Sequence, residues 1–71
     1  MQVTGIVVYE DLEGGFWGIV TSSGERYEVS NELPKAVREA GCAIQAQVEP
    51  AGTVSIRQWG RPVNVLRAKR A

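Results

Sequence analysis

Side chains able to carry out nucleophilic or acid–base chemistry are scarce in this chain of 71 residues. It has no histidine, which is the usual general base and metal ligand near neutral pH. Its single cysteine, Cys42, has neither a histidine that could activate the thiol nor a second cysteine for a zinc site. We therefore expect a non-enzymatic protein with no catalytic residue, no metal site and no cofactor, in which Cys42 is a small buried residue.

The acidic residues Glu10, Asp11 and Glu13 cluster beside a pair of glycines at residues 14–15. A calcium loop needs more oxygen ligands at defined spacing, and a phosphate-binding loop needs a following Gly-Lys-Ser/Thr and a helix. A tight, solvated turn explains both the carboxylates and the glycines. These three carboxylates would also repel phosphate groups, which disfavours nucleic acid as a partner.

Binding chemistry is concentrated in the five aromatic residues and a few arginines. An exposed Trp or Tyr beside an Arg can stack a nucleic-acid base or anchor a protein contact. Phe16 and Trp17 are neighbours in an extended segment, so they must point to opposite faces, one into the core and the other exposed or covered by the helix or tail. Trp59 fits either a barrel plug or a surface platform. The candidate contact residues are Trp17, Arg26, Tyr27, Arg57, Trp59 and Arg61.

The formal net charge of zero conceals an uneven distribution. All eight acidic residues lie between Glu10 and Glu49, whereas five of the eight basic residues follow Pro50. Such a split indicates either a basic binding surface or strand faces that carry arginine for solubility, with a solvated basic tail at residues 68–71. The second interpretation is favoured.

The composition, 44% hydrophobic and 23% charged, is that of a soluble globular domain rather than a disordered chain. The longest apolar run, residues 6–9, is far shorter than the roughly 20 residues that span a bilayer. The first residues lack the basic and apolar segments of an export signal, and a secreted domain this small usually needs disulfides. We expect a cytoplasmic protein that makes no membrane contact.

Alternation of apolar and polar residues predicts five strands. In the third, Tyr27 and Val29 are expected to face the core and Glu28 to face water. Gly5 is expected to permit a bend in the first strand, and Trp59 to Pro62 to interrupt the last, which leaves open whether it is one bulged strand or two short ones. The expected strands are residues 2–10, 15–22, 26–30, 42–49 and 53–67.

A short helix is predicted between the third and fourth strands, over residues 31–40. Ser30 or Asn31 can cap its first turn, Pro34 is tolerated there, and Gly41 can end it. The apolar pair Leu33 and Val37 would share one face of this helix.

This order of elements is that of the OB fold, a mainly-β, five-stranded Greek-key barrel. Closure of the barrel would also remove the open sheet edges that a short chain has difficulty protecting. We expect one OB-like domain over residues 1–67, followed by the tail at 68–71. An SH3-like barrel is the alternative.

The segment TGIVVYEDLEGGFWGI, residues 4–19, resembles the opening of cold-shock domains. The resemblance implies single-stranded nucleic-acid binding through surface aromatics, with Phe16 matching an aromatic of the second strand and Tyr9 loosely one of the first. The chain departs from that family, since glycines replace its basic residue before Gly-Phe and residues 26–30 lack its His and Phe. The longer connection before the fourth strand is a further departure.

A wider likeness is to short, uncharacterised prokaryotic barrel domains. These domains have a GGFWGI stretch, here residues 14–19, and a later Trp-Gly-x-Pro-Val, here residues 59–63. The resemblance implies a fold and carries no activity with it.

Two functions follow as expectations. The first is a non-enzymatic binding module that contacts a protein partner or a second copy of itself. The alternative is a single-stranded nucleic-acid-binding domain similar to cold-shock proteins.

Overall fold

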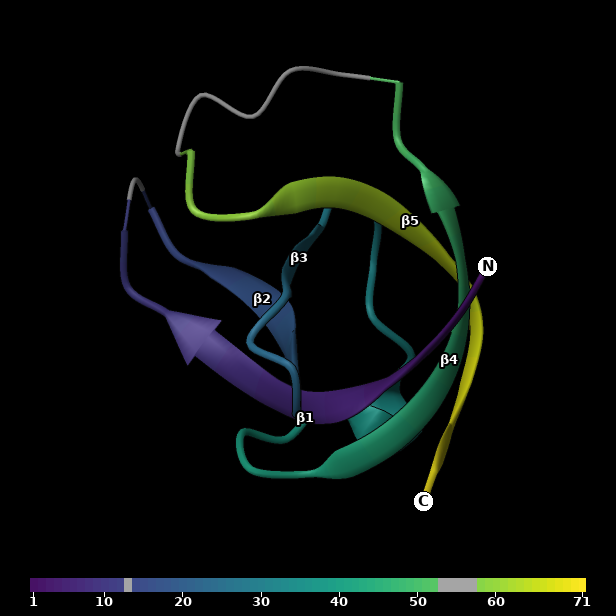
Figure 1. The fold of residues 1–71 in the computed structure, drawn as a ribbon. Helices are drawn as coiled ribbons and strands as arrows, with labels where there is room; N and C mark the ends of the chain where they lie inside the picture. The colour runs from purple at the N-terminus through teal and green to yellow at the C-terminus, as the bar shows by residue number, and fades with distance from the viewer. Residues whose placement is uncertain (13, 53–57) are drawn as a thin grey trace.

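The computed structural model describes residues 1–12, 14–52 and 58–71. Its strands close into a barrel in the order β1-β2-β3-β5-β4 (Figure 1). Neighbouring strands are antiparallel except β3 and β5, which are parallel. The predicted five-stranded barrel is confirmed, and its architecture is consistent with an OB-like fold. The strands are β1 (Gln2–Glu10), β2 (Phe16–Thr21), β3 (Arg26–Val29), β4 (Ala43–Pro50) and β5 (Arg61–Arg70).

Strand β1 closes the barrel because it pairs on both sides. Its first half pairs with β4 and its second half with β2, and Gly5 has partners in both, Thr21 and Ile44. A Cβ atom at Gly5 would lie 2.5 Å from the carbonyl oxygen of Val20. A glycine at this position therefore permits the close approach of β2 where β1 curves and changes its partner from β4 to β2 (Figure 1).

The core follows the alternation seen in the sequence. Cys42, Ile44, Ala46 and Val48 all point inward and are buried, as predicted. They pack with inward residues of β1, β2, β3 and β5 in one cluster. Full burial of an aliphatic side chain of this size contributes about 1.5–3 kcal/mol.

The predicted helix over residues 31–40 is wrong in extent, because the segment contains only a 3-10 turn, η1 (Lys35–Val37), with no side-chain cap. The amide of Asn31 instead bonds to the main chain of β5, donating to the carbonyl of Val65 at 2.8 Å and accepting from its N–H at 2.9 Å. Leu33 and Val37 still enter the core. Within the described ranges, no helix is long and apolar enough to cross a membrane.

The end of the chain continues the barrel. Residues 68–70, expected to belong to a solvated tail, form the last part of β5, and the Ala71 N–H donates to the carbonyl of Ala43 at 2.9 Å. A register shift between Gln47 and Val48 leaves Leu66 as the extra residue of a bulge, which exposes 57% of it. The part of the predicted fifth strand at residues 53–57 lies outside the described residues.

Candidate interaction surfaces

Trp59 lies against the outside of the barrel. Ile19 of β2 belongs to the core cluster, so Phe16 and Gly18, in the opposite phase of the strand, face outward. A Cβ atom at Gly18 would lie 2.6 Å from two carbons of the Trp59 indole, and the Phe16 ring meets that indole edge-on with centroids 5.3 Å apart. Trp59 is therefore a cover on the outer wall rather than a plug of the interior.

Arg26 completes this cluster from β3. Its guanidinium lies 5.3 Å from the centroid of the Trp59 ring. Gly60 lets the chain pass close to β3, since a Cβ atom there would lie 2.7 Å from the carbonyl oxygen of Arg26. We call Phe16, Gly18, Arg26 and Trp59 the Trp59 patch. A cation–π contact at a partly exposed site contributes about 0.5–1 kcal/mol, so Arg26 helps to hold the indole in place.

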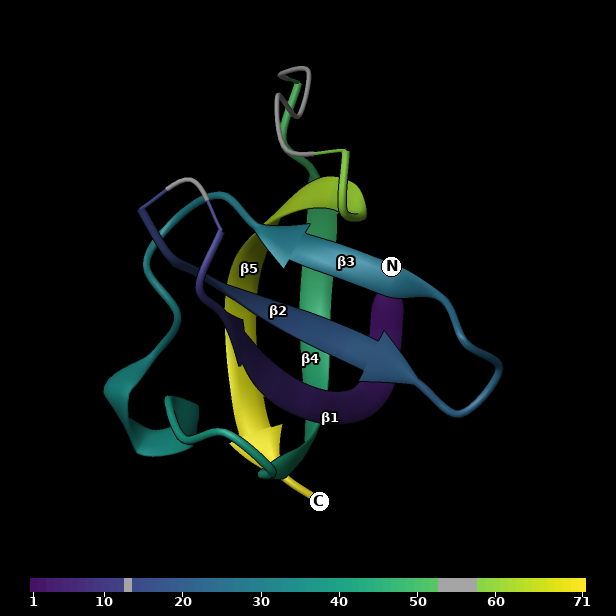
Figure 2. The same cartoon turned by 90° about the vertical axis from the view of Figure 1, so that its left-hand side faces the viewer.

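Glu28 shows the effect of this cover. The alternation of β3 predicted that Glu28 faces water, but it is only 4% exposed, so that prediction is wrong. Its partners in the neighbouring strands are Gly18 and Pro62, and Gly18 lies directly beneath Trp59. Figure 2 shows β3 running beside β2. The patch therefore shelters an outer face of the barrel that the pattern of β3 alone would leave solvated.

A second aromatic pair lies where β1 ends and β2 begins. The rings of Tyr9 and Trp17 meet edge-on with centroids 5.0 Å apart, and Trp17 packs against the core while Tyr9 is 48% exposed. Gly15, at φ +90°, makes room for the Tyr9 ring, which a Cβ atom at Gly15 would overlap. Both Phe16 and Trp17 are thus covered, and Phe16 is covered by Trp59 rather than by the helix or tail.

The predicted contact residues separate into two groups. Tyr27 is 4% exposed and Trp17 packs on the core, so neither is an open surface group. Arg61 is exposed, with its guanidinium 5.8 Å from the centroid of the Tyr27 ring. Arg26 and Trp59 come together in the patch, and Arg57 lies outside the described residues.

An apolar strip runs along the outer wall beside the patch. Ile6 is 42% exposed and faces its partner Val20 across the β1–β2 ladder, and Val8 lies beside Gly18 in the same ladder. We call Ile6, Val8 and Val20 the apolar strip; Val8 and Val20 are each half-buried. The sequence carried a signal for it, because apolar residues occupy both phases of β1.

Opposite charges flank the apolar strip. Glu10 and Asp11 lie at the end of β1, where Glu10 pairs with Phe16, and Arg26 pairs with Val20 at the far end. By strand register, the strip thus has acidic residues beyond one end and Arg26 beside the other.

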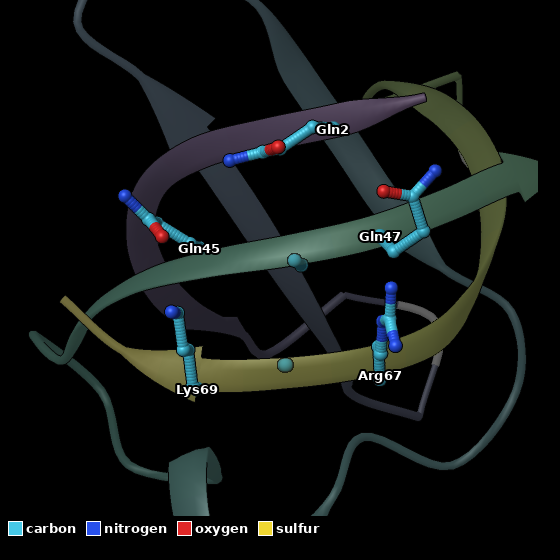
Figure 3. A pocket seen from close by; sticks show the side chains of 7 residues that line it. Gln2, Gln45, Gln47, Arg67 and Lys69 are labelled. Atoms are coloured by element: carbon cyan, nitrogen blue, oxygen red, sulfur yellow. The ribbon is translucent and has the colours of Figure 1, made fainter.

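The other side of the barrel carries a hollow with a volume of about 350 Å³ on the outer face of β1, β4 and β5 (Figure 3). None of these residues is among the predicted contact residues, although Gln45 and Gln47 occupy polar positions of the alternating strand β4. The hollow is lined by Gln2, Gln45, Ala46, Gln47, Arg67, Ala68 and Lys69.

No family model, curated protein or solved structure matches this chain. Among the residues that the structure describes, no group of three or more His, Cys, Asp or Glu side chains could hold a metal ion. The features of the described structure that could bind a partner are therefore those of the two outer walls of the barrel.

Proposed function

We propose that this protein is a non-enzymatic interaction module that associates with a second copy of itself through the apolar strip and the adjoining Trp59 patch. The observation that supports this most directly is the placement of Ile6, Val8 and Val20 on the outside of a closed barrel. A cytoplasmic location is part of the proposal, since Cys42 is an unpaired, buried thiol.

Association through side chains suits this architecture. Each strand of the closed barrel, within the described residues, has a neighbouring strand on both sides, so we expect a partner to bind the outer faces of the strands rather than a sheet edge. Removing apolar surface from water contributes about 25 cal/mol per Å² before the costs of association. Trp and Arg, the residues of the patch, are also the types that dominate binding energy in protein interfaces.

The charges around the strip favour a second copy as the partner. A two-fold axis pairs each surface with itself in reverse. Such an arrangement across the apolar strip brings Glu10 and Asp11 of one copy toward Arg26 of the other, twice in the same dimer. This complementarity selects the partner and its orientation.

Sedimentation velocity from micromolar to millimolar protein tests the proposal. We expect a monomer–dimer equilibrium that Ile6→Thr weakens about tenfold or more. Leu66→Thr is the matched control, because Leu66 is an exposed aliphatic residue of the opposite wall. A monomer at every concentration, or equal weakening by both variants, would contradict a dimer formed through the strip.

Single-stranded nucleic-acid binding is the second candidate, favoured by one observation. Trp59 and Arg26 lie over β2 and β3, the face on which OB barrels bind oligonucleotides. Against it, the Trp59 ring is already engaged by Arg26, and Glu10 and Asp11 border the same wall.

Titration with oligothymidine and oligouridine at low salt separates the two candidates. Nucleic-acid binding predicts quenching of tryptophan fluorescence, lost in Trp59→Leu and weakened steeply by added salt. Dimerisation without such quenching supports the interaction module alone.

A further inference from the structure

The hollow on β1, β4 and β5 is built as two rows of polar side chains. One row joins Gln2, Gln47 and Arg67, which are consecutive partners across the three strands. The other row pairs Gln45 with Lys69. Figure 3 shows the side chains of Arg67 and Lys69 extending from β5 toward β4, and the side chain of Gln2 extending along β1 toward Gln45.

The floor of the hollow is main chain. Ala46 and Ala68 are partners between the two rows, and both pack toward the core rather than outward. On β4 and β5, therefore, no large side chain lies between the rows. Side chains of one face are about 6.6 Å apart along a strand, so the two rows border the hollow on opposite sides.

The cations of the hollow have no partner within the described part of the chain. Two other arginines do have ion-pair partners. The guanidinium of Arg38 lies 3.8 Å from the carboxylate of Glu32, and that of Arg70 lies 3.3 Å from the carboxylate of Glu39. Arg67 and Lys69 are exposed and make no such contact with another described residue, and no carboxylate lines the hollow.

The amides give the hollow a second kind of chemistry. The side-chain amides of Gln2, Gln45 and Gln47 also form no hydrogen bond to another described residue. Each amide can donate and accept, which matches hydroxyl groups, and paired cations match a phosphate. The hollow offers no aromatic side chain on which a nucleobase could stack.

We propose that this hollow binds a sugar phosphate, with Arg67 and Lys69 contacting the phosphate and the three glutamines contacting the hydroxyl groups. A volume of about 350 Å³ is at the lower end of the range for small-molecule sites, about 300–1,000 Å³. The site lies on β1, β4 and β5 and shares no residue with the apolar strip or the Trp59 patch. It is therefore independent of the proposed dimer.

Titration of the ¹⁵N-labelled protein with glucose 6-phosphate, followed by two-dimensional NMR, tests the proposal. We expect saturable shifts of the side-chain amides of Gln45 and Gln47, with a Kd on the order of 1 mM because the charges are exposed to solvent. Inorganic phosphate should bind at least fivefold more weakly, and glucose should cause no saturable shift. Equal affinity for phosphate and glucose 6-phosphate would overturn the assignment of a sugar phosphate, and no saturable shift would overturn the site.

Substitutions locate the binding within the hollow. Arg67→Gln and Lys69→Gln should each raise the Kd for glucose 6-phosphate at least fivefold, whereas Lys35→Gln should leave it unchanged. Lys35 is the matched control, since it is an exposed lysine on η1, outside the hollow. Gln47→Ala should reduce the preference for glucose 6-phosphate over phosphate. An equal loss in the Lys35 variant would show binding to diffuse positive charge and would overturn the proposal, and thermal unfolding of each variant verifies that it is folded.

Discussion

The two outer walls of this barrel are built from similar alternating strands but differ in how far they are exposed to solvent. On β2 and β3 the outward-facing residues Phe16, Gly18 and Glu28 are buried, because Trp59 lies over Gly18 and next to Phe16. On β1, β4 and β5 the outer glutamines and cations stay open around a hollow. Glu28 on the first wall is buried, whereas Gln45 on the second is only half-buried. Alternation of apolar and polar residues therefore predicts which side chains face the interior of the barrel. It does not predict which part of the outer surface is exposed to water.

Gly18→Val should have the largest effect on the difference between the two walls. A Cβ atom at residue 18 would lie only 2.6 Å from two carbons of the Trp59 indole. The valine side chain must therefore displace the ring and expose the outer face of β2 and β3. We expect a loss of about 2–3 kcal/mol in the free energy of unfolding, measured with urea, and a red shift of tryptophan emission. Gln45→Val, at an outer position of the open wall, is the control and should change stability by less than about 0.5 kcal/mol. Similar losses in both variants would show that the two walls do not differ.

Asn31→Ala tests the junction of β3 and β5, where the two walls meet. Asn31 makes two hydrogen bonds to the main chain of Val65, which extend the short parallel ladder of β3 and β5. Their loss should cost about 1–2 kcal/mol and should speed hydrogen exchange at the Val65 amide. Asn64→Ala is the control on the same strand and should leave that exchange rate unchanged. Unaltered exchange in Asn31→Ala would show that β5 holds its place without this amide.

Arg67→Gln should have the smallest effect on stability. Because Arg67 is exposed and forms no ion pair within the described residues, we expect urea unfolding to change by less than about 0.5 kcal/mol. Arg70→Gln is the comparison, since Arg70 bonds to the carbonyl of Ala36 and pairs with Glu39. A larger loss from Arg67→Gln than from Arg70→Gln would mean that the hollow serves the fold rather than a ligand.

Strands and core were predictable from local pattern. The alternation that starts at Cys42 has one phase that is almost wholly apolar, and a strand allows such a phase to point only toward the core. The barrel also followed from the order of the elements, because a short helical connection after the third strand leaves few ways to close five strands.

The errors share one physical cause, which is competition from residues distant in sequence. Asn31 was expected to cap a helix but bonds to β5, 34 positions further along the chain. Glu28 was expected in water but lies beside the glycine that Trp59 covers. Residues 68–70 were expected in a solvated tail but pair with β4 as the end of β5. None of these partners is visible in a local window of sequence.

The candidate site divides in the same way. Trp59, Arg26 and Arg61 were selected from their residue types, but the glutamines of the hollow were not, because a glutamine on a strand is ordinary until two neighbouring strands bring others beside it. Trp17 and Tyr27 were selected for the same reason as Trp59, yet Tyr27 belongs to the core and Trp17 packs against it.

The amino-acid sequence by itself determined the closed barrel, its inward-facing residues and the shortage of groups that could catalyse a reaction, since these depend on alternation and composition. Only the tertiary structure decided which outer wall is covered and which is open. That outcome depends on where Trp59 lies against the barrel, and on which side chains the register of β1, β4 and β5 places side by side.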